Sequence, residues 1–382
     1  MSIRRASTTQ LDPPANDLRP WSDLPLDIID LIAAELPLPD RVRFAAVCKS
    51  WSSTSASLDL TDSRPWPVLM CLPKATGDVQ LYYFFDPFGR RVYDTDDQLS
   101  SINGGLTLRS SKDGWVLISD EDDAIYFFNP FTGEDEDIFE LPMVDKFPSR
   151  FSGISFSSPP TSSDCVVLGI ECNDFFDGGI QVFWWRHGDP DWTYKSYTNN
   201  LPFCVAKNNP VFHGGLFYFL GKYGNLGVFD PKEETWTVLD KPKPSHPMRI
   251  IGTSNCKVST KISQNRSKQE CYLVESSKGE MLSVFSYNDG EKILVSRLNE
   301  SKMAWEKVKD LGDDALFVDK RASLSVVAPS RGARNRIYFP RFSDGDNKEG
   351  VYYSLESKKY CANSMNFVEQ RADCVWIMPS KA

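Results

Sequence analysis

The amino-acid sequence predicts a mainly β protein: a β-propeller of about six blades, each of four antiparallel strands, that follows a small unit of three helices. Three observations predict this fold. From Trp66 onward, short runs of β-branched and aromatic residues alternate with turns rich in Gly, Pro, Asn and Asp. A turn motif recurs along these runs, as it does in repeat architectures. Residues 21–57 instead carry helical periodicity and helix-capping residues.

Composition places the chain among folded proteins with a large core. Its 382 residues are 41% hydrophobic and 13% aromatic, which is more apolar material than a disordered chain contains. Residues 1–20 have Arg4 and Arg5 near their start but no apolar run after them, so we interpret them as a flexible leader and not as a secretory signal. No apolar run approaches the roughly 20 residues of a membrane span, and we expect no membrane partner.

The first predicted helix carries more apolar surface than one packing face requires. Ser22 or Asp23 can cap its start, and Pro37 ends it. Its apolar residues form two stripes, Pro25, Ile28, Ile32 and Leu36 in one and Leu26, Ile29 and Ala33 in the other. A surface helix normally has one apolar face, so either the propeller or a partner must cover the second stripe. Two further short helices are expected over residues 40–47 and 49–57.

The predicted propeller covers residues 64–382, and its repeated unit contains a turn of Asp or Asn followed by Pro. Phe-Phe-Asp-Pro-Phe at residues 84–88 recurs as Phe-Phe-Asn-Pro-Phe at residues 127–131, and Val-Phe-Asp-Pro at residues 228–231 is a third copy. Looser copies bring the number of units to six. Repeats of about 40–60 residues with four strands are typical of propeller blades. We interpret the turn residues as turn chemistry and four tryptophans as packing between blades: Trp115, Trp192, Trp236 and Trp305.

Charge is distributed unevenly along the chain, whose net charge is -9. Residues 86–140 hold fourteen Asp and Glu but four Lys and Arg, whereas residues 241–270 hold seven Lys and Arg and one Glu. The overall acidity argues against general nucleic-acid binding. Four basic residues of a polar insert are candidates for binding an acidic protein substrate: Lys257, Lys261, Arg266 and Lys268. A solubilising loop is the alternative interpretation of this insert.

The residues that carry metal or catalytic chemistry form no motif in this sequence. Nine cysteines are scattered without a Cys-x-x-Cys pair, so neither a zinc site nor a disulfide framework is predicted. Free thiols are typical of the cytoplasm or nucleus. Three histidines lie outside any catalytic pattern, and we expect no cofactor, no metal and no enzymatic activity. Some propellers are glycosidases that use paired carboxylates, so a propeller hydrolase is one alternative.

The residues of the helical unit also carry a resemblance to a known family. Leu24-Pro25, Ile28-Ile29 and Val47-Cys48-Lys49-Ser50-Trp51, at their spacing over residues 21–57, resemble an F-box. The remainder resembles the kelch-like, KIB-type β-propeller that follows the F-box in a group of plant proteins. The strand that begins Gly114-Trp115, the Asn-Pro-Phe-Thr-Gly turn at residues 129–133 and the closing Cys-Val-Trp-Ile at residues 374–377 carry this second resemblance.

The resemblance implies a function. F-boxes bind the Skp-type adaptor of a cullin-containing ubiquitin ligase, the SCF complex, and the domain that follows holds a protein substrate. Matching residues of this sequence would form the adaptor-binding surface: Leu24, Pro25, Ile28, Ile32, Leu36, Val42 and Trp51. Ala45-Ala46 departs from the family, whose members often carry bulkier or basic residues there. The predicted function is therefore the substrate-recognition subunit of such a ligase, and a propeller scaffold that acts outside a ligase is the other alternative.

Overall fold

The computed structural model divides the chain into two units, residues 1–65 and residues 66–382. The residues that it describes are 21, 24–35, 51, 66–72, 82–85, 92–94, 102, 105–131, 138–143, 151–172, 179–206, 208–222, 224–242, 270–287, 292–328, 332–342, 350–363 and 373–379.

The first unit contributes one helix, α1 (Leu26–Glu35), to the described residues. The carbonyl of Pro25 accepts hydrogen bonds from the backbone N–H groups of Ile28 and Ile29, at 3.0 and 3.1 Å. Proline is tolerated at this position because the first turn of a helix needs no N–H donor. The two further predicted helices lie outside the described residues, except for Trp51. No described helix combines the length and the apolar character that a membrane crossing demands.

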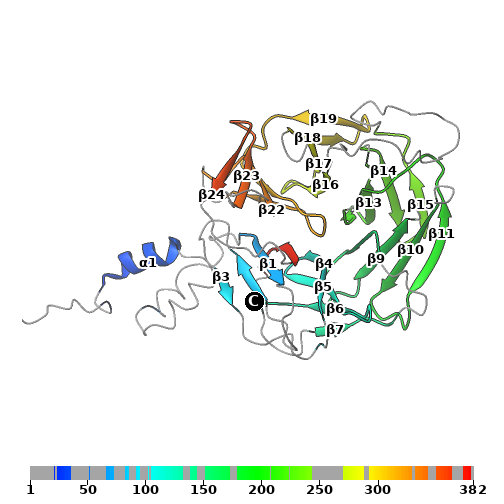
Figure 1. Cartoon of the computed structure of the whole chain (residues 1–382), viewed down its shortest axis with the longest axis horizontal. Coiled ribbons are helices and arrows are strands. Elements are labelled where there is room, and N and C mark those ends of the chain that lie inside the picture. Colours follow the sequence, from blue (N-terminus) through cyan, green and yellow to red (C-terminus); the bar gives the residue numbers. More distant parts are fainter. Residues whose placement is uncertain are drawn as a thin grey trace, which may run out of the picture. The chain divides into compact units, whose positions relative to one another are not determined.

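The second unit is a six-bladed β-propeller, with six sheets arranged around a central axis (Figure 1). Each sheet is one blade, numbered here 1 to 6 in the order in which the chain first enters it. Blades 1 to 3 contain β25 (Asp373–Ile377), β1 (Val68–Leu72), β2 (Tyr83–Phe85) and β3 (Val92–Asp94); β4 (Thr107–Lys112), β5 (Trp115–Ser119), β6 (Ile125–Phe128) and β7 (Ile138–Glu140); and β8 (Gly153–Phe156), β9 (Val166–Cys172), β10 (Gly179–Arg186) and β11 (Thr193–Thr198).

Blades 4 to 6 follow in the same way around the ring. They contain β12 (Val211–His213), β13 (Leu216–Leu220), β14 (Leu226–Asp230) and β15 (Thr235–Val238); β16 (Glu270–Glu275), β17 (Met281–Tyr287), β18 (Lys292–Asn299) and β19 (Ala304–Val308); and β20 (Asp314–Phe317), β21 (Leu324–Val327), β22 (Arg336–Phe342), β23 (Gly350–Ser354) and β24 (Lys359–Asn363). The prediction of about six blades is confirmed.

Blade 1 closes the ring, because it combines the first strands of the propeller with its last (β1 is blue and β25 red in Figure 1). β25 pairs antiparallel with β1 from Val68↔Ile377 to Leu72↔Asp373. Alternate residues of β1 face opposite ways: Met70 packs in a cluster with residues of blade 2, and Leu69 in a cluster with residues of blade 6. All five residues of β1 are therefore buried, the pattern of a strand covered on both faces.

Blade 6 differs from the four-stranded antiparallel pattern that the other five blades follow. It has five strands, and β20 pairs antiparallel with β21 but parallel with β22. The chain leaves β20, turns back along the channel as β21 and then crosses to the other side of β20 as β22. The inner position of this blade is thus occupied by β21, an additional strand that the repeat pattern did not predict.

The recurring Asp/Asn-Pro motif forms turns, as predicted. The Asn129 side chain accepts a hydrogen bond from the backbone N–H of Phe131 at 3.1 Å. Asp230 accepts two such bonds, from Lys232 at 2.8 Å and Glu233 at 3.1 Å. Both side chains bond to their own backbone, which fixes the exit from the third strand of the blade. The copy at residues 84–88 continues beyond the described residues after position 85.

Three tryptophans tie neighbouring blades together. The indole N–H of Trp192 donates to the carbonyl of Pro142, that of Trp236 to Asn199 Oδ1 and that of Trp305 to the carbonyl of Gly224, at 2.9, 2.9 and 2.6 Å. Each bond joins a blade to the one before it. Trp115 lies in the apolar cluster that blades 2 and 3 share, so all four tryptophans pack as predicted.

We expect the propeller to fold without the helical unit. A fragment of residues 64–382 contains every blade, and it should be soluble, monomeric and β-rich by circular dichroism and gel filtration. The same fragment ended at residue 372 lacks β25, which leaves the buried strand β1 with an open edge, and it should aggregate. Aggregation of the longer fragment, or a folded monomer for the shorter one, would contradict this expectation.

Candidate functional site

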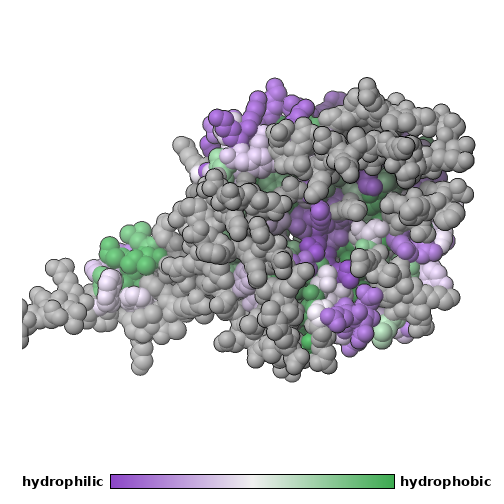
Figure 2. Space-filling model, viewed as in Figure 1, coloured by the Kyte–Doolittle hydropathy of each residue, from purple (hydrophilic) through white to green (hydrophobic). Residues whose placement is uncertain are grey.

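The helix α1 presents an apolar surface to solvent (Figure 2, green). Ile28 is 43% exposed, Ile32 37% and Leu31 65%, whereas Ile29 is completely buried. At about 100° per residue the three exposed side chains share one face of the helix, and Ile29 lies off that face. Ile29 is therefore packed, and the exposed side chains form a contiguous apolar surface of the kind that marks a binding site.

The residues predicted to bind an adaptor fall partly on this face. Pro25 is exposed at its start, together with Ile28 and Ile32, and Leu24 is half-buried beside them. Trp51 is half-buried as well. Leu36 and Val42 lie outside the described residues, and their roles stay predictions.

The residues predicted to bind the adaptor do not include Leu31 and Leu26, which are 65% and 55% exposed. Leu31 lies on the same exposed face of α1 as Ile28 and Ile32, about 60° around the helix axis from Ile28. The signal was present in the sequence, because Leu31 follows Ile28 by three residues, the spacing of neighbours on one helix face. Leu26 stands at the first position of the helix.

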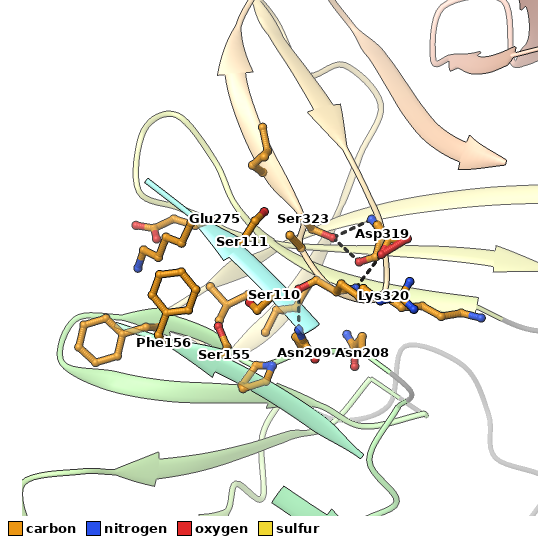
Figure 3. Close-up of a pocket in the computed structure, with 18 of the residues that line it drawn as sticks. Ser110, Ser111, Ser155, Phe156, Asn208, Asn209, Glu275, Asp319, Lys320 and Ser323 are labelled. Carbon is orange, nitrogen blue, oxygen red and sulfur yellow. Dashed lines mark hydrogen bonds between the residues drawn. The ribbon is translucent and has the colours of Figure 1, made fainter. Parts of the chain in front are cut away.

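A second candidate site is a cavity of about 300 Å³ in the central channel of the propeller (Figure 3). Its walls come from the inner strands β4, β8, β12, β16 and β21 and from the segments before β12 and between β20 and β21. Hydrophilic side chains gather around the middle of the ring in Figure 2. Six of the lining residues are serines: Ser110, Ser111, Ser155, Ser276, Ser323 and Ser325.

Asn209 connects blades on different sides of the channel. Its Nδ2 donates to the carbonyls of Arg109 and Arg321, at 2.7 and 2.6 Å, and its Oδ1 accepts from the backbone N–H of Ile154 at 3.0 Å. Its own backbone N–H donates to the carbonyl of Lys320 at 2.8 Å. One side chain thus joins blades 2, 3 and 6 to the segment that begins blade 4.

The arginine of the segment between β20 and β21 is engaged in the same way. Arg321 Nε donates to the carbonyl of Leu108 at 2.6 Å, and its guanidinium forms an ion pair with Asp373. Asp319 accepts a hydrogen bond from the backbone N–H of Arg321 at 2.8 Å. Burial raises the pKa of Asp319 and of Asp373, and in both cases the nearby Arg321 opposes that increase. The cation holds the inner strands of blades 1 and 2 to blade 6.

Lys112 and Glu275 of the cavity also have partners. Lys112 Nζ donates to the carbonyl of Ser157 at 2.7 Å and lies 5.3 Å from the centre of the Phe212 ring. Burial lowers its pKa, while the nearby Asp113 and Glu275 carboxylates act to raise it. Glu275 Oε1 lies 3.0 Å from His213 Nδ1.

Two side chains of types that often serve in catalysis, Asp120 and His213, make structural contacts here. Asp120, from the acidic stretch at residues 120–123, accepts hydrogen bonds from the backbone N–H groups of Asp122 and Ala124 and from the hydroxyl of Tyr126. It therefore organises a hairpin turn. His213 belongs to β12 and pairs with Glu275. The basic candidates Lys257, Lys261, Arg266 and Lys268 lie outside the described residues.

Both parts of the chain match known families. Residues 21–63 match the F-box domain, and residues 84–353 match the KIB1-4 beta-propeller. The F-box/kelch-repeat protein At1g57790 of Arabidopsis thaliana is 32% identical over 366 residues, which cover 94% of this chain and 95% of that protein. The F-box protein At1g49360 of the same plant is 30% identical over 83% of this chain and 60% of its own length.

The fold, the exposed helix and these matches define a two-part protein in which an F-box precedes a β-propeller. The chain belongs to the KIB1-4 β-propeller family of F-box proteins.

Replacing Asn209 should destabilise the propeller. Asn209→Leu leaves the partly buried carbonyls of Arg109 and Arg321 and the N–H of Ile154 without their partner, and we expect the free energy of unfolding to fall by about 3 kcal/mol. Asn299→Leu is the matched control, because Asn299 makes its side-chain bonds at the surface; it should change stability by less than about 0.5 kcal/mol. Urea denaturation of the full chain measures both, and equal effects would refute the role given to Asn209.

Proposed function

We propose that this protein is the substrate-recognition subunit of an SCF-type ubiquitin ligase. In this role the F-box binds a Skp-type adaptor and, through it, a cullin, while the propeller holds a protein substrate. The observation that carries the proposal is the exposed apolar face of α1 inside the F-box match at residues 21–63. Branched aliphatic side chains on one helix face are the anchors with which a helix binds the groove of a partner.

The mechanism that we propose is proximity. A receptor that holds its substrate beside the charged conjugating enzyme raises the effective concentration of the substrate's lysines at the reactive thioester. The chemistry then belongs to other subunits, so the receptor needs no catalytic group of its own. We place this activity in the nucleus or the cytoplasm. No disulfide forms among the cysteines whose side chains the structure describes, which supports this compartment.

The substrate, in our proposal, binds to segments that connect the strands of the propeller. The strands are committed to packing between blades, whereas connecting segments are free to vary. One such segment is the basic insert that contains Lys257, Lys261, Arg266 and Lys268. In our proposal its positive charge attracts an acidic target.

Adaptor binding should depend on the exposed face of α1. Leu24→Ala with Pro25→Ala, and separately Leu31→Glu, should each weaken binding of a purified Skp-type adaptor by about 30- to 1000-fold, since truncating a central anchor typically costs 2–4 kcal/mol. Tyr360→Ala is the control, because Tyr360 is 40% exposed but belongs to the propeller. Titration calorimetry measures the affinity, and circular dichroism checks the fold. Unchanged affinity in folded variants would refute the adaptor role.

Charge reversal of the basic insert should affect the substrate step alone. With Lys257, Lys261, Arg266 and Lys268 changed to Glu, we expect slower capture of an acidic substrate and a weaker dependence on salt, because attraction between opposite charges acts mainly on the association rate. Adaptor affinity should stay the same. If substrate capture and turnover equal those of the unmodified protein at both low and moderate salt, the insert has no part in recognition.

A further inference from the structure

The channel cavity contains one buried polar group that the fold leaves unused. Asn208 is only 5% exposed, and within the described part of the chain its Nδ2 has no hydrogen-bond acceptor. Figure 3 shows Asn208 at the cavity together with Ser110 and Ser155. These three side chains come from three successive blades, from β4, from β8 and from the segment before β12. Ser110 is 2% and Ser155 8% exposed.

A buried amide without a partner is unfavourable to the folded state, and native proteins contain few such groups. The adjacent Asn209 makes the contrast clear, because both atoms of its carboxamide are bonded to backbone groups. Asn209 thus accounts for the connection between the blades, and the connection does not need Asn208. A donor that lines a cavity without stabilising the fold points to a ligand that accepts its hydrogen bond.

The charges around the cavity indicate that this ligand is neutral. Arg321 is paired with Asp373, and Lys320 lies 3.6 Å from Glu270. Lys112 is held by a backbone carbonyl and by the ring of Phe212, with the Glu275 carboxylate nearby. An anion that binds at Arg321, Lys320 or Lys112 would have to displace one of these partners, whereas hydroxyl and amide groups remain to bind uncharged polar atoms.

The volume of the cavity and the apolar residues of its lining further restrict which ligands can bind. A cavity of about 300 Å³ is at the lower end of small-molecule sites. Phe212, Leu273 and Met378 add apolar surface to the polar groups. A small ring with hydroxyls at its edge and C–H groups on its faces satisfies both kinds of surface.

We propose that the central channel binds an uncharged, hydroxyl-rich small molecule of about the size of one monosaccharide. Asn208 Nδ2 donates to a hydroxyl oxygen of the ligand, and the hydroxyls of Ser110 and Ser155 complete its hydrogen bonds. This site is separate from adaptor binding and does not rest on the proposed ligase function.

Saturation-transfer NMR on the full chain tests the proposal with D-glucose, D-galactose, D-mannose, L-fucose and myo-inositol at millimolar concentration. At least one of these should bind. Asn208→Leu keeps the side-chain volume and removes the donor, so it should weaken that binding about tenfold or more. Ser155→Ala should also weaken it. Ser283→Ala is the matched control, because Ser283 is equally buried, its Oγ has no partner among the described residues, and it does not line the cavity.

Thermal denaturation separates a ligand from a structural water. If Asn208 is kept for a ligand, Asn208→Leu leaves the midpoint unchanged or raises it, because an unpaired donor has been removed. A fall in the midpoint as large as that of Asn209→Leu would show that a water already satisfies Asn208, and it would overturn the proposal. Failure of all five compounds to bind would overturn it too, as would full affinity in Asn208→Leu or binding of a capped Gly-Ser-Asn-Ser-Gly peptide at the same residues in place of the sugars.

Discussion

The pairing of β25 with β1 holds the propeller closed, and every other part of the ring depends on it. Five residue pairs join these strands at the inner edge of blade 1. β1 then packs against blade 2 with one set of alternate side chains and against blade 6 with the other. No blade of a propeller can bury both faces alone, so a ring without this pairing would expose two apolar faces at once.

A closed ring creates a channel, and the channel is where polar side chains can lie inside the protein. Asn209 and Arg321 use that position to join strands of different blades through backbone carbonyls, which replaces the hydrogen bonds that the inner strands of those blades do not make with each other. Asn208 stands beside them with its donor unused. The channel therefore holds both the residues that join the blades, Asn209 and Arg321, and the residue that we propose binds a ligand, Asn208.

The repeats made the fold predictable, whereas features that occur once escaped prediction. The shared Phe-Phe and Asx-Pro residues at 84–88 and 127–131 identified the blades because the same packing problem recurs in each. The helical unit was predictable because its apolar residues have a helical period and a family pattern. The added strand β21 and the parallel pairing of β20 with β22 in blade 6 have no second copy. The sequence Asn208-Asn209 is typical of an ordinary turn. Only the folded ring brings Asn209 to the carbonyl of Arg321, 112 residues away in sequence.

The position of β25 also has a consequence for how the protein is made. β1 ends at Leu72 and its partner begins at Asp373, so about 300 residues must be synthesised between them. At roughly 5–20 residues per second the ribosome needs about 15–60 s for that length. During this interval blade 1 is incomplete, and a strand destined to be wholly buried has a free edge. The time for which this edge stays open is therefore set by translation speed, and slower synthesis lengthens the period in which the nascent chain can aggregate.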